Sequence, residues 1–320
     1  MKIVVLDGYR LNPGDLSWDE LIKLGEVKIF DRTPDDKILE RAQGAQALLT
    51  NKTPLSATTL QQLPDLRYIG VLATGYDVID VTAAAPQQVV VTNVPSYGTD
   101  SVAQFVFALL FELCHQVGQH ASSVQQGAWT ANPDWCYWET PLIELAGKTM
   151  GIIGAGRIGM QTARVAHALG MKVIAINGKG ETDRDVPFDG FRWTSRDELF
   201  RNSDVVSLHC PLTAETEFII NKKHLGLMKS NAFLINVARG KLVNEIDLAQ
   251  ALNERRIAGA ALDVLSTEPP ASDNPLLHAP HCIITPHIAW ATREARGRLL
   301  QTAVDNVRSF LDGKPQNVVH

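Results

Sequence analysis

Short apolar runs alternate with amphipathic stretches over the first part of the chain. The amphipathic stretches at 15–25 and 56–63 have apolar residues at helical spacing, and Ser56 is placed to cap the second of them. Continuous apolar strands separated by helices are typical of a parallel sheet that is covered on both faces. The runs that we predict as strands lie at 2–7, 27–30, 47–50, 68–73 and 89–93.

A second alternating region follows a long apolar segment. Residues 100–127 are rich in aliphatic and aromatic side chains and predict one long helix, and residues 292–313 predict an amphipathic helix at the end of the chain. Between them, strands again alternate with helices, which predicts a full doubly wound sheet. Its predicted strands lie at 148–154, 171–177, 204–210, 232–238, 258–264 and 282–287.

A glycine-rich turn, GIIGAGRIG, stands almost halfway along the chain. An apolar strand precedes it and a helix follows it, which is the context of a dinucleotide-binding turn. Gly154 permits the tight turn, Gly156 lets the backbone approach a pyrophosphate, and Gly159 lets the helix pack on the strand. The first helical residues, Arg157 and Ile158, present backbone N–H groups to the phosphates.

The position of this turn predicts the domain organisation. The expected fold class is α/β, with two Rossmann-like doubly wound parallel-sheet domains. The cofactor domain spans 100–287 and is inserted into a flavodoxin-like substrate domain made of 1–99 and 288–320. We expect the terminal helix to return to the substrate domain and the reacting groups to lie between the domains, where ligand sites often occur.

The strand after the glycine turn ends without an acid. In NAD-binding domains an Asp or Glu at this point binds the ribose 2′-hydroxyl, but here Asn177 takes that place and Lys179 follows. Without the carboxylate a 2′-phosphate is not repelled, and Lys179 would attract it. The alternative is that Asn177 hydrogen-bonds the ribose and Lys179 is solvated. NAD(H) and NADP(H) are therefore both open as the cofactor.

Three later strands are each followed by polar residues suited to the reduction of a keto acid. Arg239 follows one strand, Asp263 and Glu268 follow the next, and His287 follows the last. The carboxyl ends of parallel strands share one edge of the sheet, so we expect these side chains to meet there. An arginine binds a carboxylate through two hydrogen bonds, and a histidine beside a carboxylate can donate a proton near neutral pH. The alternative for Arg239 is a structural ion pair with an acid such as Glu245.

The segments GIIGAGRIG, INVARGKLV, ALDVLSTEPP and ITPHIAW resemble, in this order, the signature segments of the D-isomer-specific 2-hydroxyacid dehydrogenase family. The resemblance covers essentially the whole chain. It implies that Arg239 binds the substrate carboxylate and carbonyl, that His287 is the acid and base, and that Glu268 supports His287. It also implies that Asp263 holds the nicotinamide carboxamide of NAD(H) or NADP(H).

The resemblance extends to two loops. In LATGYD, the backbone N–H groups of Ala73, Thr74 and Gly75 would bind the substrate carboxylate, although Gly75 by itself is also typical of a plain turn. The segment HCPLTAET resembles the loop along the cofactor, which makes His209 a wall residue rather than a second catalytic histidine. The other cofactor contacts that the resemblance implies are Thr99, Cys210, Pro211, Thr216, Val237 and Ala238.

Within the family, GVLATGYDVID and NVPSYGTDSVA look most like glycerate dehydrogenases, also called hydroxypyruvate reductases. The implied reaction is the reduction of hydroxypyruvate or glyoxylate to the D-2-hydroxy acid, and the reverse oxidation. Specificity for D-lactate or phosphoglycerate is an alternative within the family. A redox-sensing, NAD(H)-binding corepressor-like protein is the alternative from another class. Glu268 stands where the formate dehydrogenase branch lacks an acid, which argues against formate.

Composition narrows the expected partners. The chain has 320 residues, a net charge of −5 and four cysteines, with no CxxC pair. We therefore expect no metal site and no nucleic-acid or membrane partner. We also expect a cytoplasmic location, where thiols stay reduced.

The loop 128–147 carries three tryptophans, Trp129, Trp135 and Trp138. Exposed aromatic residues in a long loop indicate burial against another surface. Three interpretations are open: a subunit interface, the rim of the substrate cleft, and a loop folded onto its own domain. The family usually dimerises through its nucleotide domains, so the resemblance implies a homodimer.

Overall fold

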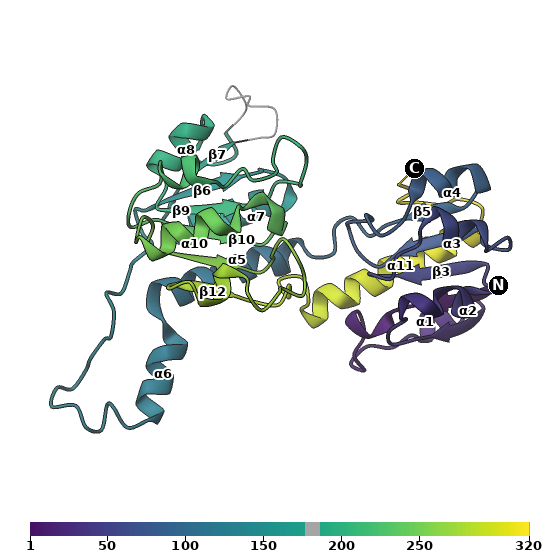
Figure 1. The fold of residues 1–320 in the computed structure, drawn as a ribbon, viewed down its shortest axis with the longest axis horizontal. Coiled ribbons are helices and arrows are strands. Elements are labelled where there is room, and N and C mark those ends of the chain that lie inside the picture. Colours follow the sequence, from purple (N-terminus) through teal and green to yellow (C-terminus); the bar gives the residue numbers. More distant parts are fainter. Residues whose placement is uncertain (177–185, 320) are drawn as a thin grey trace. The chain divides into compact units, whose positions relative to one another are not determined.

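A computed structural model describes residues 1–176 and 186–319 and divides the chain into two compact units. The first unit combines Met1–Gly98 with Trp290–His320, and the second is Thr99–Ala289. Each unit contains one sheet, and all the strand pairs are parallel (Figure 1). The predicted α/β class with two parallel sheets is confirmed.

The sheet of the first unit has the strand order β2-β1-β3-β4-β5. This is the flavodoxin-like order, in which the direction of winding reverses between β1 and β3. Every apolar run predicted as a strand in this unit forms one; β3 and β4 are fully buried, whereas β2 at the edge of the sheet is only partly buried. The strands are β1 (Lys2–Val5), β2 (Glu26–Ile29), β3 (Ala47–Thr50), β4 (Tyr68–Val71) and β5 (Val90–Thr92).

Short helices and the terminal helix cover this sheet. Ser56 caps α3 as predicted, since its hydroxyl accepts a hydrogen bond from the Thr59 N–H. The apolar face of α11 packs through Leu299, Val304 and Val307 into one core cluster with β1, β3 and β4. The helices of the unit are α1 (Asp19–Ile22), α2 (Ile38–Ala42), α3 (Ala57–Gln61), α4 (Val81–Ala84) and α11 (Arg293–Leu311).

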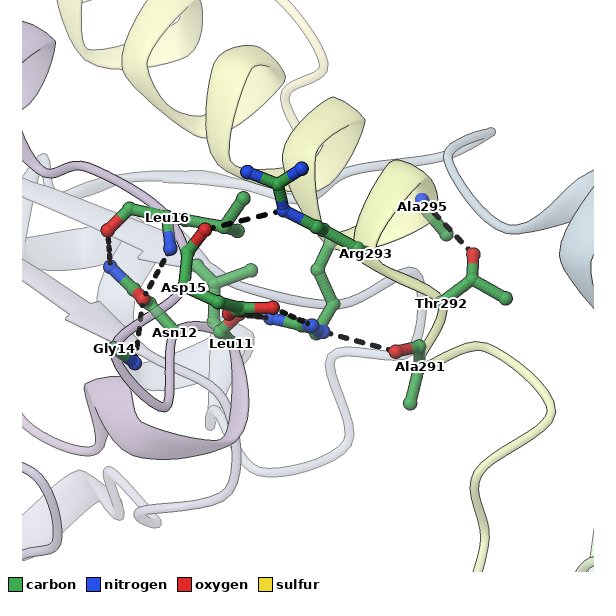
Figure 2. Close-up of polar contacts among 10 residues, drawn as sticks. Leu11, Asn12, Gly14, Asp15, Leu16, Ala291, Thr292, Arg293 and Ala295 are labelled. Carbon is green, nitrogen blue, oxygen red and sulfur yellow. Dashed lines mark hydrogen bonds and ion pairs between the residues drawn. The ribbon is translucent and has the colours of Figure 1, made fainter.

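Hydrogen bonds join the start of α11 to the loop 11–16 of the same unit (Figure 2). Arg296 is 8% exposed, and its guanidinium donates to both carboxylate oxygens of Asp15, at 2.7 Å each. It also donates to the carbonyl oxygens of Leu11 and Ala291, both at 3.0 Å. A planar guanidinium matches a carboxylate in this two-bonded geometry, so α11 has a fixed position on the first unit. α11 thus belongs to the same compact unit as Met1–Gly98.

The sheet of the second unit has the order β12-β11-β10-β9-β6-β7-β8, with the reversal between β6 and β9. The predicted strands are present, and β8 is an addition to them. β8 has only three residues at the sheet edge, too few for a recognisable pattern. Its Phe191 ring makes T-shaped contacts with the rings of Phe188 and Trp193. The strands are β6 (Thr149–Ile153), β7 (Lys172–Ile176), β8 (Phe191–Trp193), β9 (Val205–Leu208), β10 (Phe233–Asn236), β11 (Gly259–Leu262) and β12 (Cys282–Ile284).

The helices of this unit lie on both faces of its sheet. α5 packs with α7, and α8 and α10 both contact α9. Right-handed connections that run in opposite directions from the reversal point place these two groups on opposite faces. The helices are α5 (Thr99–His115), α6 (Val117–Gln125), α7 (Arg157–Ala168), α8 (Arg196–Asn202), α9 (Lys222–Leu225) and α10 (Glu245–Asn253).

The prediction of one continuous helix over 100–127 is wrong. Gln116 adopts left-handed backbone angles, and α5 and α6 meet there at a bend of 56°. The apolar run of α5 is buried in the unit, whereas α6 has no buried residue, so nothing in the core holds the second part in line with the first. No single helix among the described residues is long and apolar enough to cross a membrane; only the bent α5–α6 pair, taken together, meets that length and composition criterion.

The tryptophan loop follows α6 and extends with it away from the sheet (Figure 1). The loop is joined to α6, because the hydroxyls of Tyr137 and Ser123 lie 2.8 Å apart and the Glu139 N–H donates to His120 Nε2 at 3.2 Å. Trp135 is nevertheless 86% exposed and Trp138 is 64% exposed. These exposures contradict the interpretation in which the loop buries its indoles on its own domain.

Candidate active site

Three neighbouring strands bring the predicted reacting groups to one edge of the second sheet. β10, β11 and β12 are paired in register, with Asn236 beside Leu262 and Leu262 beside Ile284. The segments that leave these strands carry Arg239, then Asp263 with Glu268, then His287. Since parallel strands end at the same edge, these groups share the carboxyl edge, where α/β proteins bind their ligands.

Glu268 and His287 form a direct pair. Glu268 Oε2 lies 2.6 Å from His287 Nδ1, and the other carboxylate oxygen accepts the Leu265 N–H at 3.1 Å. The side chains are 37% and 34% exposed, respectively, so solvent and small molecules can reach the pair. A carboxylate at Nδ1 fixes the orientation of the imidazole and stabilises its protonated form. Nε2 is then the ring nitrogen that can exchange a proton with a substrate.

A buried carboxylate supports the segment that carries His287. Asp263 is 1% exposed and accepts hydrogen bonds from the Thr285 hydroxyl at 2.6 Å, the Ile288 N–H at 2.9 Å and the Ala289 N–H at 2.8 Å. Burial raises the pKa of this carboxyl, and the Thr285 hydrogen bond opposes that shift. His287 has a left-handed φ of 56°, an unfavourable geometry that the flanking bonds to Asp263 hold in place. This supporting role of Asp263 was not predicted from the sequence.

The backbone around Arg239 is shaped by a buried asparagine and a glycine. Asn236 is fully buried; its amide donates to the Arg239 carbonyl at 2.9 Å and its oxygen accepts the Ala238 N–H at 3.0 Å. Gly240 lies so close to Leu265 that a Cβ there would overlap the Leu265 carbonyl group. The Arg239 turn therefore packs directly on the turn that leads to Glu268. Neither neighbour was predicted as a site residue, although the glycine directly after the arginine was a visible signal.

The structural alternative for Arg239 can be judged from the partners of Glu245. One oxygen of the Glu245 carboxylate accepts the Ser266 N–H at 2.6 Å, and the other accepts the Asn274 amide at 2.7 Å. Glu245 thus supports the loop that contains Glu268 instead of pairing with Arg239. The Arg239 side chain is exposed, and its guanidinium donates to the Ala238 carbonyl at 2.8 Å. It is therefore accessible to a carboxylate ligand.

The glycine-rich turn has the geometry that a dinucleotide needs. Gly154 has a φ of 98°, and a Cβ there would lie 2.7 Å from Cys210 Cα. A Cβ at Gly159 would overlap the Gly154 carbonyl oxygen, so α7 can pack this closely only with glycine. At Gly156, the N-cap of α7, a Cβ would meet no atom within 4 Å. This open space at a helix N-terminus fits a pyrophosphate, and the residues present therefore fit NAD(H) or NADP(H).

The loop after β9 borders the same turn. The His209 N–H donates to the Ile153 carbonyl at 2.7 Å, which joins the ends of β9 and β6. Burial lowers the pKa of His209 to about 3, so its ring is neutral at pH 7, and its Nε2 lies 2.9 Å from the Ser207 hydroxyl. Cys210 is buried, and the Thr216 hydroxyl donates to the Pro211 carbonyl at 2.7 Å. Thr216 thus shapes this loop, and contact of these residues with cofactor stays a prediction.

The remaining predicted cofactor residues are placed as follows. Val237 is buried and Ala238 half-buried at the end of β10, and Thr99 is half-buried as the first residue of α5. Asn177 and Lys179 lie outside the described residues. The preference for NAD(H) or NADP(H) must therefore be argued from residues other than Asn177 and Lys179.

The predicted substrate loop, Ala73–Gly75, belongs to the first unit. It follows β4, and its shape is held by hydrogen bonds to the segment after β5. The Thr74 hydroxyl donates to the Val94 carbonyl at 2.8 Å, and the Asn93 amide donates to the Thr74 carbonyl at 2.7 Å. The role of this loop in binding the substrate carboxylate stays a prediction, as does the placement of the reacting groups between the domains.

Comparison with known families agrees with this arrangement. Residues 107–289 match the family model described as "D-isomer specific 2-hydroxyacid dehydrogenase, NAD binding domain". The chain belongs to this family. As a member of it, the protein is an oxidoreductase with a nucleotide-binding domain of the NAD-binding type.

Similar proteins support the same assignment over the full length. A hydroxypyruvate reductase from Blautia hydrogenotrophica is 51% identical over 100% of both chains. A glycerate dehydrogenase from Methylorubrum extorquens is 43% identical and covers 99% of this chain and 98% of its own. Among solved structures, an acyclic imino acid reductase, Bsp5, in complex with NADPH and D-Arg superposes with a TM-score of 0.86 at 33% identity and 100% coverage of both chains.

Proposed function

We propose that this dehydrogenase reduces a small 2-keto acid, hydroxypyruvate or glyoxylate, to the D-2-hydroxy acid with NAD(P)H, and catalyses the reverse oxidation. The observation that carries the proposal is the 2.6 Å contact between Glu268 and His287 on the same sheet edge as Arg239. The names of the two most similar relatives cited above support the substrate class.

The site residues supply binding and proton transfer. A bound reduced nicotinamide supplies the hydride for C2 of the keto acid. Arg239 binds the substrate carboxylate with two N–H groups and polarises the carbonyl. His287 Nε2 gives its proton to the carbonyl oxygen, which completes the hydroxyl group. Glu268 stabilises the imidazolium before transfer and holds the neutral ring in position afterwards. In the oxidation, His287 takes the hydroxyl proton back.

Steady-state kinetics with a substrate panel test this proposal. Hydroxypyruvate, glyoxylate, pyruvate and phosphohydroxypyruvate are each assayed with NADH and with NADPH, and the configuration of the product is determined. We expect the highest kcat/KM for hydroxypyruvate or glyoxylate and a D product. A preference for pyruvate or phosphohydroxypyruvate would reject the substrate assignment. Tight NADH binding without turnover of any acid would favour a redox-sensing protein.

We also propose that the protein is a homodimer whose interface includes α6 and the tryptophan loop. The support is that the indoles of Trp135 and Trp138, both on this loop, are largely exposed. α6 itself buries none of its residues in the chain. Large exposed aromatic side chains on one segment are typical of a protein–protein interface. In a two-fold dimer, the same segment of a second copy of the chain would cover them.

Light scattering coupled to gel filtration measures the dimer. We expect the unmodified protein to have the mass of two chains, and the Trp135→Ser/Trp138→Ser variant to dissociate at a concentration at least about tenfold higher than wild type. Ile246→Ser on α10 removes another exposed apolar side chain, 71% exposed, and serves as the control. A monomeric wild-type protein, or an unchanged dimer in the double variant, would contradict this interface.

The cytoplasm is the compartment that we propose for the protein. Its four cysteines are all free thiols, two of them buried. Free thiols persist in a reducing compartment, which supports this location.

A further inference from the structure

We propose that Arg196, the first residue of α8, binds the 2′-phosphate of NADP(H), and that the protein therefore prefers NADP(H) to NAD(H). The proposal concerns the cofactor and does not depend on which keto acid is reduced. It rests on the position of Arg196 at the sheet edge, on its charge, and on the hydrogen bonds that engage Glu198, an acid in the same turn of α8.

Arg196 lies shortly after β8, the strand beside β7. In doubly wound nucleotide domains the ribose 2′ position lies at the carboxyl end of the second strand, which here is β7. β7 and β8 are parallel neighbours with Ala175 beside Trp193, and the Thr194 N–H donates to the Ala175 carbonyl at 3.0 Å. Thr194, the first residue after β8, is therefore level with the end of β7, and Arg196 comes two residues after Thr194.

The same edge contains the glycine turn and the loop after β9. The Gly154 N–H donates to the carbonyl of Ile176, the last residue of β7, at 3.2 Å, and Gly154 lies against the backbone of Cys210. Burial raises the pKa of the Cys210 thiol, and the positive charge of Arg196 nearby lowers it. Together with the position of its backbone after β8, this places Arg196 near the edge at which the adenosine half of a dinucleotide binds.

The face of α8 that carries Arg196 can be placed from its neighbours. Phe200 follows Arg196 by four residues, so both side chains lie on one face of the helix. The Phe200 ring stacks on His224, with ring centroids 4.8 Å apart. Burial lowers the pKa of His224, and the charge of Arg196 lowers it further. This face of α8 is therefore turned toward α9, while the helix itself packs against β6 and β7.

Within the part of the chain that the structure describes, no acid is paired with the guanidinium of Arg196. Glu198, in the same turn of α8, accepts hydrogen bonds from the hydroxyls of Thr194 at 2.7 Å and Ser195 at 3.2 Å. Its own N–H donates to Ser195 at 3.4 Å, which completes a capping box. Asp197 is the other acid of this turn and is exposed. No ion pair joins Arg196 to an acid within residues 1–176 and 186–319, and its side chain is exposed to ligand.

An arginine in this position distinguishes the two cofactors. A phosphate dianion accepts two N–H bonds from a guanidinium, and the attraction between the charges strengthens them. The 2′-hydroxyl of NAD(H) offers no charge, so its complex gains little from the same side chain. The sequence predicts a cation, Lys179, directly after β7, whereas Arg196 reaches the same edge of the sheet after the neighbouring strand, β8.

Calorimetric binding of nucleotide fragments tests the proposal without catalysis. The ligands are 2′,5′-ADP and 5′-ADP, followed by NADPH and NADH, and the variant is Arg196→Gln. We expect wild type to bind 2′,5′-ADP at least about tenfold more tightly than 5′-ADP. The variant should lose about tenfold to hundredfold in affinity for 2′,5′-ADP and NADPH, and less than about twofold for 5′-ADP and NADH.

Arg201→Gln is the matched control. Arg201 is an exposed arginine in the last turn of the same helix, and its replacement should leave all four affinities unchanged. Equal losses for 2′,5′-ADP and 5′-ADP in Arg196→Gln would mean that Arg196 contacts the base or ribose, and would overturn the proposal. An unchanged NADPH affinity, or a wild-type preference for 5′-ADP, would overturn it too. Melting temperatures verify that both variants fold.

Discussion

Replacing His287 by alanine is expected to lower kcat by about 10²- to 10⁴-fold while the affinity for NAD(P)H changes little. The substitution removes the only group of the Glu268–His287 pair that can carry a proton to the carbonyl oxygen, whereas the glycine turn and α7 are untouched. Single-turnover rates with hydroxypyruvate measure the chemical step, and fluorescence titration with NADPH measures cofactor binding.

His281→Ala is the control for this experiment. His281 is an exposed histidine just before β12, and it has nearly the same left-handed φ, 54° against 56° for His287. Alanine therefore meets a similar backbone penalty at both positions, and only the chemistry differs. Turnover close to wild type in His287→Ala, or an equal loss in His281→Ala, would reject His287 as the proton donor.

Replacing Arg239 by alanine should reduce kcat/KM for the keto acid by about 100-fold or more, mainly through a higher KM. The guanidinium is exposed on the catalytic edge and offers two N–H groups to a carboxylate. Alanine removes both the charge and these hydrogen bonds. Arg239→Lys keeps the charge without the two-bonded geometry and should fall between wild type and alanine. Initial-rate kinetics over a wide range of keto acid concentrations separate KM from kcat.

Lys241→Gln tests whether any nearby positive charge would serve. Lys241 is exposed two residues after Arg239 and should be replaceable with little effect on KM. A large KM increase in this variant, with little effect of Arg239→Ala, would assign carboxylate binding to Lys241 instead.

Central strands such as β3, β4, β9 and β10 were predictable because their side chains are buried on both faces of the sheet, which leaves continuous apolar runs. β8 was not, since a three-residue edge strand gives no such run and is stabilised by ring contacts with Phe188. The break at Gln116 was hidden for a different reason. The apolar residues continue past it, but those beyond it are exposed, and burial cannot be read from composition.

The reacting groups of the candidate site could be predicted from sequence because each lies in the segment that leaves one of three strands. The hydrogen bonds that hold these segments could not be predicted. Glu245, on α10, fixes the backbone of Ser266, and Asp263 fixes three groups of the segment 285–289. Such hydrogen bonds join loops that are distant in the chain, and only the geometry of the sheet brings them together.

The return of α11 to the first unit has a consequence for biosynthesis. As the chain leaves the ribosome, Val5, Tyr68 and their neighbours emerge before the second unit, but their packing partners Leu299 and Val304 emerge only after it. The second unit is contiguous from Thr99 to Ala289, so all of its strands are available before α11 is made. We therefore expect the later-encoded unit to be the first to fold, while the N-terminal sheet lacks its covering helix, and depends on protection from aggregation, until α11 has been made.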